Sequence, residues 1–482
     1  MSETTYRRRL FVLAICCLAL LMVGMDNTIV NVALSAIGAD LHASLSDLQW
    51  TVDAYTMVLA TLLLLAGSTA DRLGRKRVFL VGLVVFTVGS LLCSLAPGLG
   101  WLIAFRMVQA IGGAMLNPVA MAIIANVFTD ARERAFAIGV WGGVVGISIG
   151  LGPVIGGLLI EAVGWPGIFW INAPIGVAAI VLVARFVPES RAPEPRRPDP
   201  LGQLLVILIL SSLTWAIIES PHQGWTAPAT LLALAVTVGS LILLLWWESR
   251  REQPLIELRF FRSVPFSGAT VMAVCAFANY TGFLFLNTLY LQQVRGLTAL
   301  EAGLCTVPLA IGSLFFAPLS GRIVGARGPR IPLVSAGVVM TIGALMLLGA
   351  TPHTPLPYVL LSYLMFSIGF GLVNTPITNS AVSGMPRSRA GLASAFATTS
   401  RQVGATLGVA IVGSVLNLGL ASRSVRDGFV SAEAACWWII AGCGVAIVVI
   451  GLLTSSRWAK GTADRVLIEE TPPARSAPAL RS

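Results

Sequence analysis

Three charged side chains stand inside long apolar stretches of this sequence, where a charge is costly and is usually retained for a function. Asp26 and Asp53 are the only two of the 22 acidic residues well within such stretches, and Arg106 lies in a third. If each stretch is a membrane helix rising about 1.5 Å per residue, all three lie in the outer half of the bilayer. Desolvation favours a protonated carboxyl group, and a nearby cation or water favours the ionised form. We therefore predict proton exchange at Asp26 and Asp53, modulated by Arg106; the alternative is that one Asp pairs with Arg106 or caps a helix kink.

A second group of polar residues stands in apolar stretches of the C-terminal half. Arg401 lies in the middle of one stretch, and that half has no deeply placed acid to pair with it. It could bind an anionic group of a substrate, contact the other half, or donate hydrogen bonds to carbonyl groups, and the sequence leaves these alternatives open. Asn279, Tyr280 and Asn374 could line a substrate pocket, although hydrogen bonding between helices is the commoner role of such residues.

The composition excludes a soluble protein. Of the 482 residues, 56% are hydrophobic and 11% are charged, whereas soluble domains carry about 25% charged residues. The net charge of +10 does not indicate nucleic acid, because the basic residues stand in short clusters between apolar stretches. The seven cysteines have neither metal nor disulfide spacing, and the sequence has no nucleotide-binding loop of the Gly-Lys-Ser/Thr type. We therefore expect a membrane protein that uses no cofactor and no metal.

Apolar stretches of about 20 residues, long enough to cross a bilayer as a helix, occur fourteen times. Basic residues test this count, because they gather on the cytoplasmic side of membrane proteins. Of the 32 Lys and Arg residues, 27 fall on the side that carries the N-terminus, three on the opposite side and two within spans. We therefore predict that both termini are cytoplasmic. The predicted spans are residues 10–36, 46–70, 77–96, 100–126, 134–160, 166–187, 200–219, 227–247, 264–291, 300–325, 330–351, 355–384, 389–418 and 432–456.

An internal repeat divides the chain into two halves. Residues 67–77 follow the second span and residues 321–330 follow the tenth, and their glycines and basic residues align. Repeats of this kind, with the halves related by an axis along the membrane normal, are typical of transporters. The predicted parts are a six-helix bundle (1–187), a linker (188–199), two inserted helices (200–247), a second linker (248–263), a second six-helix bundle (264–456) and a disordered cytoplasmic tail (457–482).

The segment Gly-Ser-Thr-Ala-Asp-Arg-Leu-Gly-Arg-Lys-Arg at residues 67–77 resembles the loop signature of the major facilitator superfamily. Its charges stand at a helix–loop–helix junction and could pair in one state and separate in another, which predicts a cytoplasmic gate. A simple topology signal would explain the basic residues but neither Asp71 nor the glycines. The predicted gate residues are Gly67, Asp71, Arg72, Gly74 and Arg75.

Further segments resemble signatures of the same superfamily and of its fourteen-helix drug:proton antiporters. Residues 25–34 are similar to the first-helix motif of those antiporters, and Arg106, Gln109 and Gly112 to the fourth-helix motif of the superfamily. The fifth span resembles the antiporter signature, in which small residues let helices pack closely and so seal the protein against proton leak. The residues predicted for this antiporter motif are Gly139, Gly152, Pro153, Gly156 and Gly157.

The resemblance implies an all-α integral membrane protein with two six-helix bundles and two extra helices between them. It implies a proton-coupled antiporter of the plasma membrane that exports lipophilic, often cationic drugs or antibiotics by alternating access. Asp26 and Asp53 could then bind protons, substrate or both. The alternative is a dedicated exporter of one endogenous metabolite or self-made antibiotic, and an enzyme is not expected. We expect a monomer whose partners are small lipophilic molecules, protons and the lipid bilayer, without nucleic acid.

Overall fold

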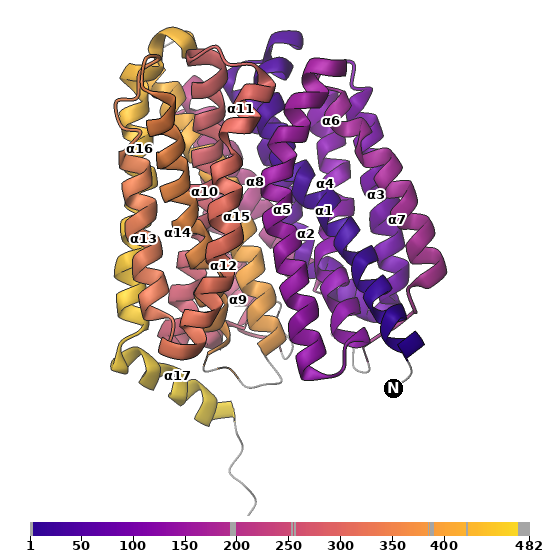
Figure 1. Ribbon diagram of the computed structural model, residues 1–482. Helices are drawn as coiled ribbons and strands as arrows, with labels where there is room; N and C mark the ends of the chain where they lie inside the picture. Colours follow the sequence, from indigo (N-terminus) through magenta and orange to yellow (C-terminus); the bar gives the residue numbers. More distant parts are fainter. Residues whose placement is uncertain are drawn as a thin grey trace, which may run out of the picture.

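The computed structural model describes residues 3–192, 199–251, 254, 257–383, 385, 390–420 and 423–470. Within these ranges the chain forms helices and no β-strand, and the long helices run side by side along one direction (Figure 1). The N-terminus and the last described helix both lie at the bottom of Figure 1. We call this end of the bundle the terminal face and the opposite end the far face.

The first half of the bundle is formed by six long helical segments, one of which is interrupted near its start. Helix α2 begins at a capping box, in which Ser44 and Asp47 satisfy each other's free backbone groups. It ends at Gly74, whose φ of 115° is readily adopted only by glycine. The segments are α1 (Glu3–Asp40), α2 (Leu45–Leu73), α3 (Arg75–Ser94), α4 (Leu99–Val127), α5 (Ala131–Val163), and the pair α6 (Gly167–Trp170) and α7 (Asn172–Phe186).

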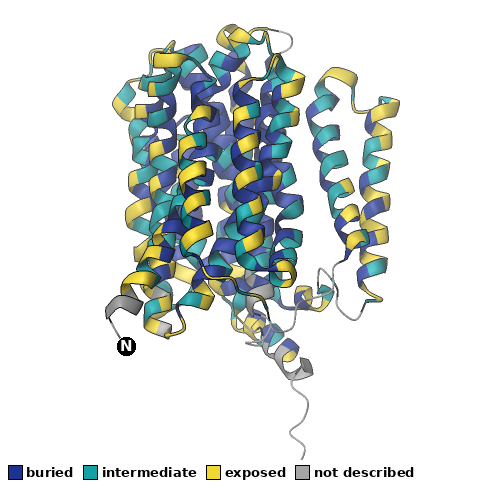
Figure 2. Cartoon of the chain, turned by 90° about the vertical axis from the view of Figure 1, so that its right-hand side faces the viewer, coloured by how far each residue is buried: buried dark blue, intermediate teal, exposed yellow. Residues whose placement is uncertain are grey.

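Two helices, α8 (Pro200–Gln223) and α9 (Pro228–Glu248), follow as a hairpin. Helix α8 lies against both halves, since Gln203 Nε2 donates to Thr61 O of α2 and Ser414 Oγ of the second half donates to Ile217 O. Helix α9 packs on α8 and is otherwise exposed, as Figure 2 shows for the hairpin at its right. Exposed apolar side chains such as Leu232 and Ile242, 66% and 63% exposed, suit contact with lipid.

The second half mirrors the first in its number of long segments. Small residues bring some of its helices close together, since Gly404 and Gly408 of one helix approach the backbone of another at Val274 and Ala278. The elements are η1 (Leu258–Arg262), α10 (Val264–Leu289) with η2 (Tyr290–Val294), α11 (Ala299–Cys305) with α12 (Val307–Arg327), α13 (Arg330–Leu345), α14 (Leu356–Val382), α15 (Ala390–Leu420), α16 (Val425–Thr454) and α17 (Arg457–Glu470).

The helical fold confirms the prediction of an all-α membrane bundle. Thirteen of the described helical segments are long and apolar enough to cross a membrane. The predicted span at 330–351 corresponds to α13, whose 16 residues are apolar but shorter, about 24 Å at 1.5 Å per residue. A hydrogen-bonded turn continues it to Ala350. Together these elements account for about fourteen crossings.

Two expectations at the C-terminal end need correction. Helix α16 begins at Val425 rather than near residue 432, because Ser424 caps it by accepting from Asp427 N. Residues 457–470, predicted as part of a disordered tail, form α17, whose Thr462 hydroxyl accepts from Val264 N. Residues 471–482 lie outside the described part of the chain, as do portions of the two predicted linkers, residues 193–198 and four positions between 252 and 256.

Candidate functional site

A closed polar network surrounds Asp26 inside the first half. Arg106 and Gln109 stand three residues apart on α4 and therefore share a helix face, and Asn172 is the first residue of α7. Asp26 Oδ2 accepts from Arg106 Nη1 at 2.6 Å, and Oδ1 accepts from Gln109 Nε2 at 2.7 Å and Asn172 Nδ2 at 2.9 Å. The side chains of Asp26 and Arg106 are at most 1% exposed. Both carboxylate oxygens of Asp26 thus accept hydrogen bonds. Asp26 forms the ion pair with Arg106 that was the alternative interpretation of the sequence.

Arg106 also contacts the second helix. Its guanidinium carbon lies 4.2 Å from the ring centroid of Tyr55 on α2, a cation–π arrangement. Its Nη1 also donates to Gln109 Oε1 at 2.8 Å. The Asp26 network therefore connects α1, α2, α4 and α7.

Asp53 has a different environment, although it lies only two residues from Tyr55. It is fully buried on α2, and neither carboxyl oxygen has a hydrogen-bond partner among the described residues. The hydroxyl of Thr56, one turn along the helix, donates to the main-chain oxygens of Val52 and Asp53 instead. A buried carboxylate without partners is costly, whereas a neutral carboxyl group costs far less.

Asp53 faces the second half of the molecule. Gln49, Asp53 and Thr56 lie at positions i, i+4 and i+7 and so occupy one face of α2. Gln49 Nε2 donates to Val409 O and Ala410 O of α15 at 3.3 and 3.0 Å, and Thr406 Oγ1 of α15 donates to Thr56 Oγ1 at 3.2 Å. Asp53 is therefore enclosed between two contacts that join the halves. We call this contact of α2 with α15 the α2–α15 seam.

The glycines of α5 form a second seam, and they show where the halves separate. Residues 157, 150, 146, 143 and 139 lie on one face of α5. A Cβ placed on Gly157 would lie 2.5 Å from Leu300 Cα, one on Gly150 would lie 2.5 Å from Ala310 Cβ, and one on Gly146 would lie 3.6 Å from Leu314 Cδ1. At Gly143 and Gly139 no described atom comes within 4 Å. The halves are therefore in contact at the far face and part toward the terminal face.

Of the other antiporter-motif residues, two pack against α1 within the first half and one contacts the second half. A Cβ on Gly152 would overlap Thr28 Oγ1, and one on Gly156 would lie 2.5 Å from Ile29 Cγ1, so both glycines allow α1 to approach α5. Pro153 O occupies the place that a Cβ on Gly303 of α11 would need. Four of the five residues thus lie at close helix contacts, whereas no described atom lies within 4 Å of a Cβ on Gly139.

A bulky side chain at Gly157 is expected to disfavour this far-face closure. Gly157→Leu overpacks the contact with Leu300, and overpacking costs about 1–3 kcal/mol. In a cysteine-free background, Glu161→Cys and Leu300→Cys report closure, because Glu161 Oε1 accepts from Leu300 N at 3.3 Å. We expect cross-linking by a short bismaleimide to slow at least about fivefold. Gly139→Leu is the matched control, and an equal rate in both variants would contradict the seam.

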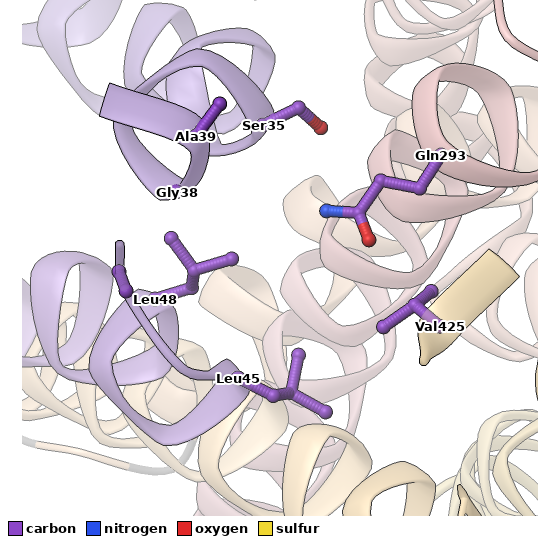
Figure 3. A pocket seen from close by; sticks show the side chains of 8 residues that line it. Ser35, Gly38, Ala39, Leu45, Leu48, Gln293 and Val425 are labelled. Carbon is purple, nitrogen blue, oxygen red and sulfur yellow. The ribbon is translucent and has the colours of Figure 1, made fainter. Parts of the chain in front are cut away.

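The seam at the far face also includes α1 and η2. Gln292 Nε2 donates to Val32 O at 2.8 Å, joining the two halves. A pocket of about 350 Å³ lies beside this contact. Figure 3 shows the side chain of Gln293 pointing into it. The pocket is lined by Ser35, Gly38, Ala39, Ala43, Leu45, Leu48, Gln293 and Val425.

The predicted gate residues lie together at the terminal face. Arg75 Nη2 pairs with Asp71 Oδ1 at 2.9 Å, and Arg75 N donates to Ser190 O. Gly74 is buried under Glu189, whose Oε1 accepts from Lys76 N. Arg72 is exposed, and Gly67 faces Pro118 of α4. Each of these contacts stays within the first half, as expected where the halves have parted.

The predicted substrate-binding residues of the second half do not form one cluster. Arg401 is half-buried and donates to Asn374 O at 3.3 Å and to Thr378 Oγ1, both on α14. Tyr280 is stacked on Phe370, and its hydroxyl has no partner among the described residues. Asn279 is 1% exposed, so it lies inside the packed helices, with no described partner for its amide.

Several residues of the site escaped sequence reasoning because they are neutral or lie near helix ends. Gln49 and Asn172 are ordinary amides in the sequence. His222 Nε2 bonds Ser46 Oγ at 2.8 Å and Asn417 Nδ2 at 3.0 Å, joining α8, α2 and α15. Glu433 is fully buried and accepts from Trp437 Nε1 at 2.9 Å, so buried acids are not limited to Asp26 and Asp53. The sequence analysis placed this residue at the end of a span, because it predicted that the last helix begins near residue 432 rather than at Val425.

The candidate site consists of buried ionisable and polar side chains. Within the described chain, no group of three His, Cys, Asp or Glu side chains could hold a metal ion. Of the four charged residues predicted for the site, Asp26 and Arg106 form a buried pair, Asp53 has no described hydrogen-bond partner, and Arg401 has only neutral described partners.

Two helical halves that meet around buried polar groups and part toward one face define a membrane transporter of small molecules. The chain belongs to the Major Facilitator Superfamily, whose family model matches residues 16–409. It is therefore a multi-pass membrane protein of a transporter family and not an enzyme.

Relatives with assigned names agree with this membership. The chain is 36% identical to the multidrug resistance protein Stp of Mycobacterium tuberculosis over 410 residues, 85% of this chain and 76% of that protein. It is 36% identical to the tetracenomycin C resistance and export protein of Streptomyces glaucescens over 398 residues, 82% and 74% of the two chains. The crystal structure of a bacterial homologue of the human lysosomal transporter Spinster matches with a TM-score of 0.65 at 18% identity, covering 98% of this chain and all of that one.

Proposed function

We propose that this protein is a proton-coupled antiporter that exports lipophilic, often cationic molecules from the cytoplasm by alternating access. The segregation of 27 of the 32 basic residues supports a cytoplasmic terminal face. The structure would then be the inward-facing state, with the far face closed to the outside. The proton gradient is the energy source, without a cofactor or a metal, and the working unit is a monomer.

The position of Asp53 carries this proposal. Its buried, unpartnered carboxyl group lies between the Gln49 and Thr56 contacts of the α2–α15 seam. Opening the far face would break these contacts and expose Asp53 to external water, where it takes up a proton. Closing the far face buries the neutral group at low cost, whereas burial of the ionised group is penalised. Protonation therefore favours closure, and this links the proton to the conformational change.

Asp26 has a different part in the proposed mechanism. Its three donors, Arg106, Gln109 and Asn172, stabilise the ionised carboxylate. It therefore holds the inner helices of the first half in position, and proton exchange belongs to Asp53. The sequence analysis predicted proton exchange at both Asp residues; the proposed mechanism gives it to Asp53 alone.

The names of two relatives support the proposed substrate class. One relative is named for multidrug resistance, and another for export of one antibiotic, tetracenomycin C. A dedicated exporter of one metabolite or self-made antibiotic is therefore the nearest alternative. A panel of unrelated lipophilic compounds separates the two, because a dedicated exporter moves only one of them.

The test is efflux of ethidium from proteoliposomes with an imposed proton gradient. We expect ethidium to move against its own gradient while the proton gradient lasts and to stop when a protonophore collapses it. Liposomes without protein provide the baseline. Efflux that continues unchanged after the collapse would show that antiport is the wrong mechanism.

A further inference from the structure

We propose that the pocket at the far face is an inhibitory site for small neutral amphipathic molecules that reach it from outside the cell. The inference rests on the proposed function, because it takes the far face as the external one and requires that face to open in each export cycle. It adds a site of control that is separate from the buried polar groups of the α2–α15 seam.

The pocket is built from the far-face ends of four helical elements, two from each half. Ser35 lies near the end of α1, and Leu45 and Leu48 lie in the first turn of α2. On the other side, Gln293 lies in η2, and Val425 is the first residue of α16. A molecule in this pocket therefore touches both halves at once.

The size and the position of the pocket suit a small molecule from the external medium. Its volume of about 350 Å³ lies at the lower end of the range of about 300–1,000 Å³ that small-molecule sites show. Ala39 in its wall is exposed, and Ala43 stands in the connection between α1 and α2. The pocket therefore borders the surface, and a molecule can enter it without crossing the protein.

Two polar side chains offer hydrogen bonds to a ligand. Figure 3 shows the Gln293 amide and the Ser35 hydroxyl pointing into the pocket from opposite halves. Ser35 Oγ has no hydrogen-bond partner among the described residues, and such a group costs stability where water has little access. Hydroxyl and amide groups can each donate and accept. An amide or hydroxyl group of a bound molecule would therefore complement both side chains.

The pocket favours a neutral ligand. All eight described lining residues are uncharged. The acids nearest to them in the sequence have partners elsewhere, since Asp40 Oδ2 accepts from Trp165 Nε1 and Asp47 Oδ2 accepts from Ser44 N. Arg426, next to the pocket lining in the sequence, is exposed to solvent. An ion in the pocket would lose water without gaining a charged partner, which is costly, whereas the leucine and valine side chains of the lining can receive an apolar ligand body.

Opening of the far face would take this site apart. Gln292 Nε2 donates to Val32 O across the two halves at 2.8 Å. Gln293 is the next residue of η2, and Ser35 lies about one turn beyond Val32 on α1. When the halves separate here, the two sides of the pocket separate with them. A ligand that binds only the closed form stabilises that form by mass action, so an occupied pocket slows the step that releases cargo to the outside.

The test uses naphthalene-1-acetamide, a neutral aromatic amide, and naphthalene-1-acetate, an anion of nearly the same shape. Equilibrium dialysis measures binding to the purified full-length protein. Cross-linking of Glu161→Cys with Leu300→Cys reports closure of the far face, in the cysteine-free background that also carries Gly157→Leu to disfavour closure. We expect the amide, at about ten times its dissociation constant, to speed cross-linking about three- to tenfold. Absence of saturable binding or an unchanged cross-linking rate would overturn the proposal.

Variants then locate the site. Gln293→Leu should weaken binding of the amide about three- to tenfold, the loss typical of a hydrogen bond, and Ser35→Ala should weaken it by a smaller factor. Binding of the acetate should not change in either variant. Gln223→Leu, which replaces an exposed amide at the far-face end of α8, is the matched control. Equal affinity for the amide in Gln293→Leu and the wild type would refute the assignment to this pocket, and an equal loss for the acetate would refute the neutral ligand class.

Transport measurements separate this proposal from the proposed function. In proteoliposomes with a proton gradient, the amide at about ten times its dissociation constant should slow ethidium efflux by the wild type at least about fivefold. The inhibition should weaken in Gln293→Leu in proportion to the lost affinity. Full-rate efflux with the amide bound would show that the pocket is not inhibitory. Ethidium efflux that ignores the proton gradient would instead refute the proposed function, and the cross-linking result would stand.

Discussion

Asp53→Asn is expected to abolish proton-driven efflux and to leave the fold intact. Asparagine has nearly the shape of a protonated aspartic acid and cannot ionise. Since neither oxygen of Asp53 has a described hydrogen-bond partner, the substitution removes no such bond. The variant would remain fixed in the form that resembles the protonated state, in which the α2–α15 seam favours closure.

The measurement is ethidium efflux from proteoliposomes with and without a proton gradient, together with the melting temperature of the purified protein. We expect the gradient-dependent rate to fall at least about a hundredfold, since the one exchanging group is removed. The melting temperature should stay within about 1 °C of the wild type, which corresponds to about 1 kcal/mol for a chain of this size. Gradient-driven efflux that survives in this variant would show that Asp53 does not exchange the proton.

Asp47→Asn is the control for the same helix. Asp47 lies in the exposed capping box at the start of α2, and it is also an aspartate of that helix. Its replacement should cost about 0.5–1 kcal/mol of capping and leave proton-driven efflux in place. The pair of variants separates a general effect on α2 from loss of the buried carboxyl group.

Asp26→Ala is expected to have the largest effect on stability. It leaves the guanidinium group of Arg106 buried without its carboxylate, and removing one partner of a buried ion pair costs about 3–5 kcal/mol. Arg106→Ala should cost a similar amount, because it leaves Asp26 without its cation. The two effects should not add, since each single variant strands the other charge. We therefore expect the double variant to be no more than about 1–2 kcal/mol less stable than either single variant.

Reversible unfolding in mixed micelles, followed by tryptophan fluorescence, measures this cycle. Fully additive losses would show that Asp26 and Arg106 do not interact energetically and would contradict the network of the first half. Asp53→Asn belongs in the same experiment as a comparison, because it should change the unfolding free energy little. A large loss for Asp26 with none for Asp53 would support the division of roles between the two carboxyl groups.

Much of the fold could be predicted from the sequence because the bilayer imposes simple physical requirements. Each crossing needs a long apolar run, every backbone group must be satisfied within its own helix, and basic residues mark one side. The errors fell where these requirements are weak. The start of α16 at Val425 depends on a polar cap by Ser424, and α17 is an amphipathic helix beyond the last apolar run.

The candidate site could be predicted in part for the same reason. A charge in an apolar run is visible in a sequence, so Asp26, Asp53, Arg106 and Arg401 were found. Their partners were not, because Gln49, Asn172 and Thr406 are neutral residues whose importance depends on what they face. Glu433 was missed because the span was predicted to begin at residue 432, which placed Glu433 at the membrane edge. The helix in fact begins eight residues before Glu433, at Val425.

By itself, the sequence determined the class of molecule, the number of crossings and the charged residues able to act within them. The physical reason is that a membrane helix must be long and apolar, so a charged residue within one is rare and easily recognised. Only the tertiary structure decided that Arg106 pairs with Asp26 and leaves Asp53 alone at the contact between the halves. That choice depends on which helices pack together and on their rotation about their axes. These are set by small residues such as Gly152 and Gly157 meeting distant parts of the chain, and no local pattern records such contacts.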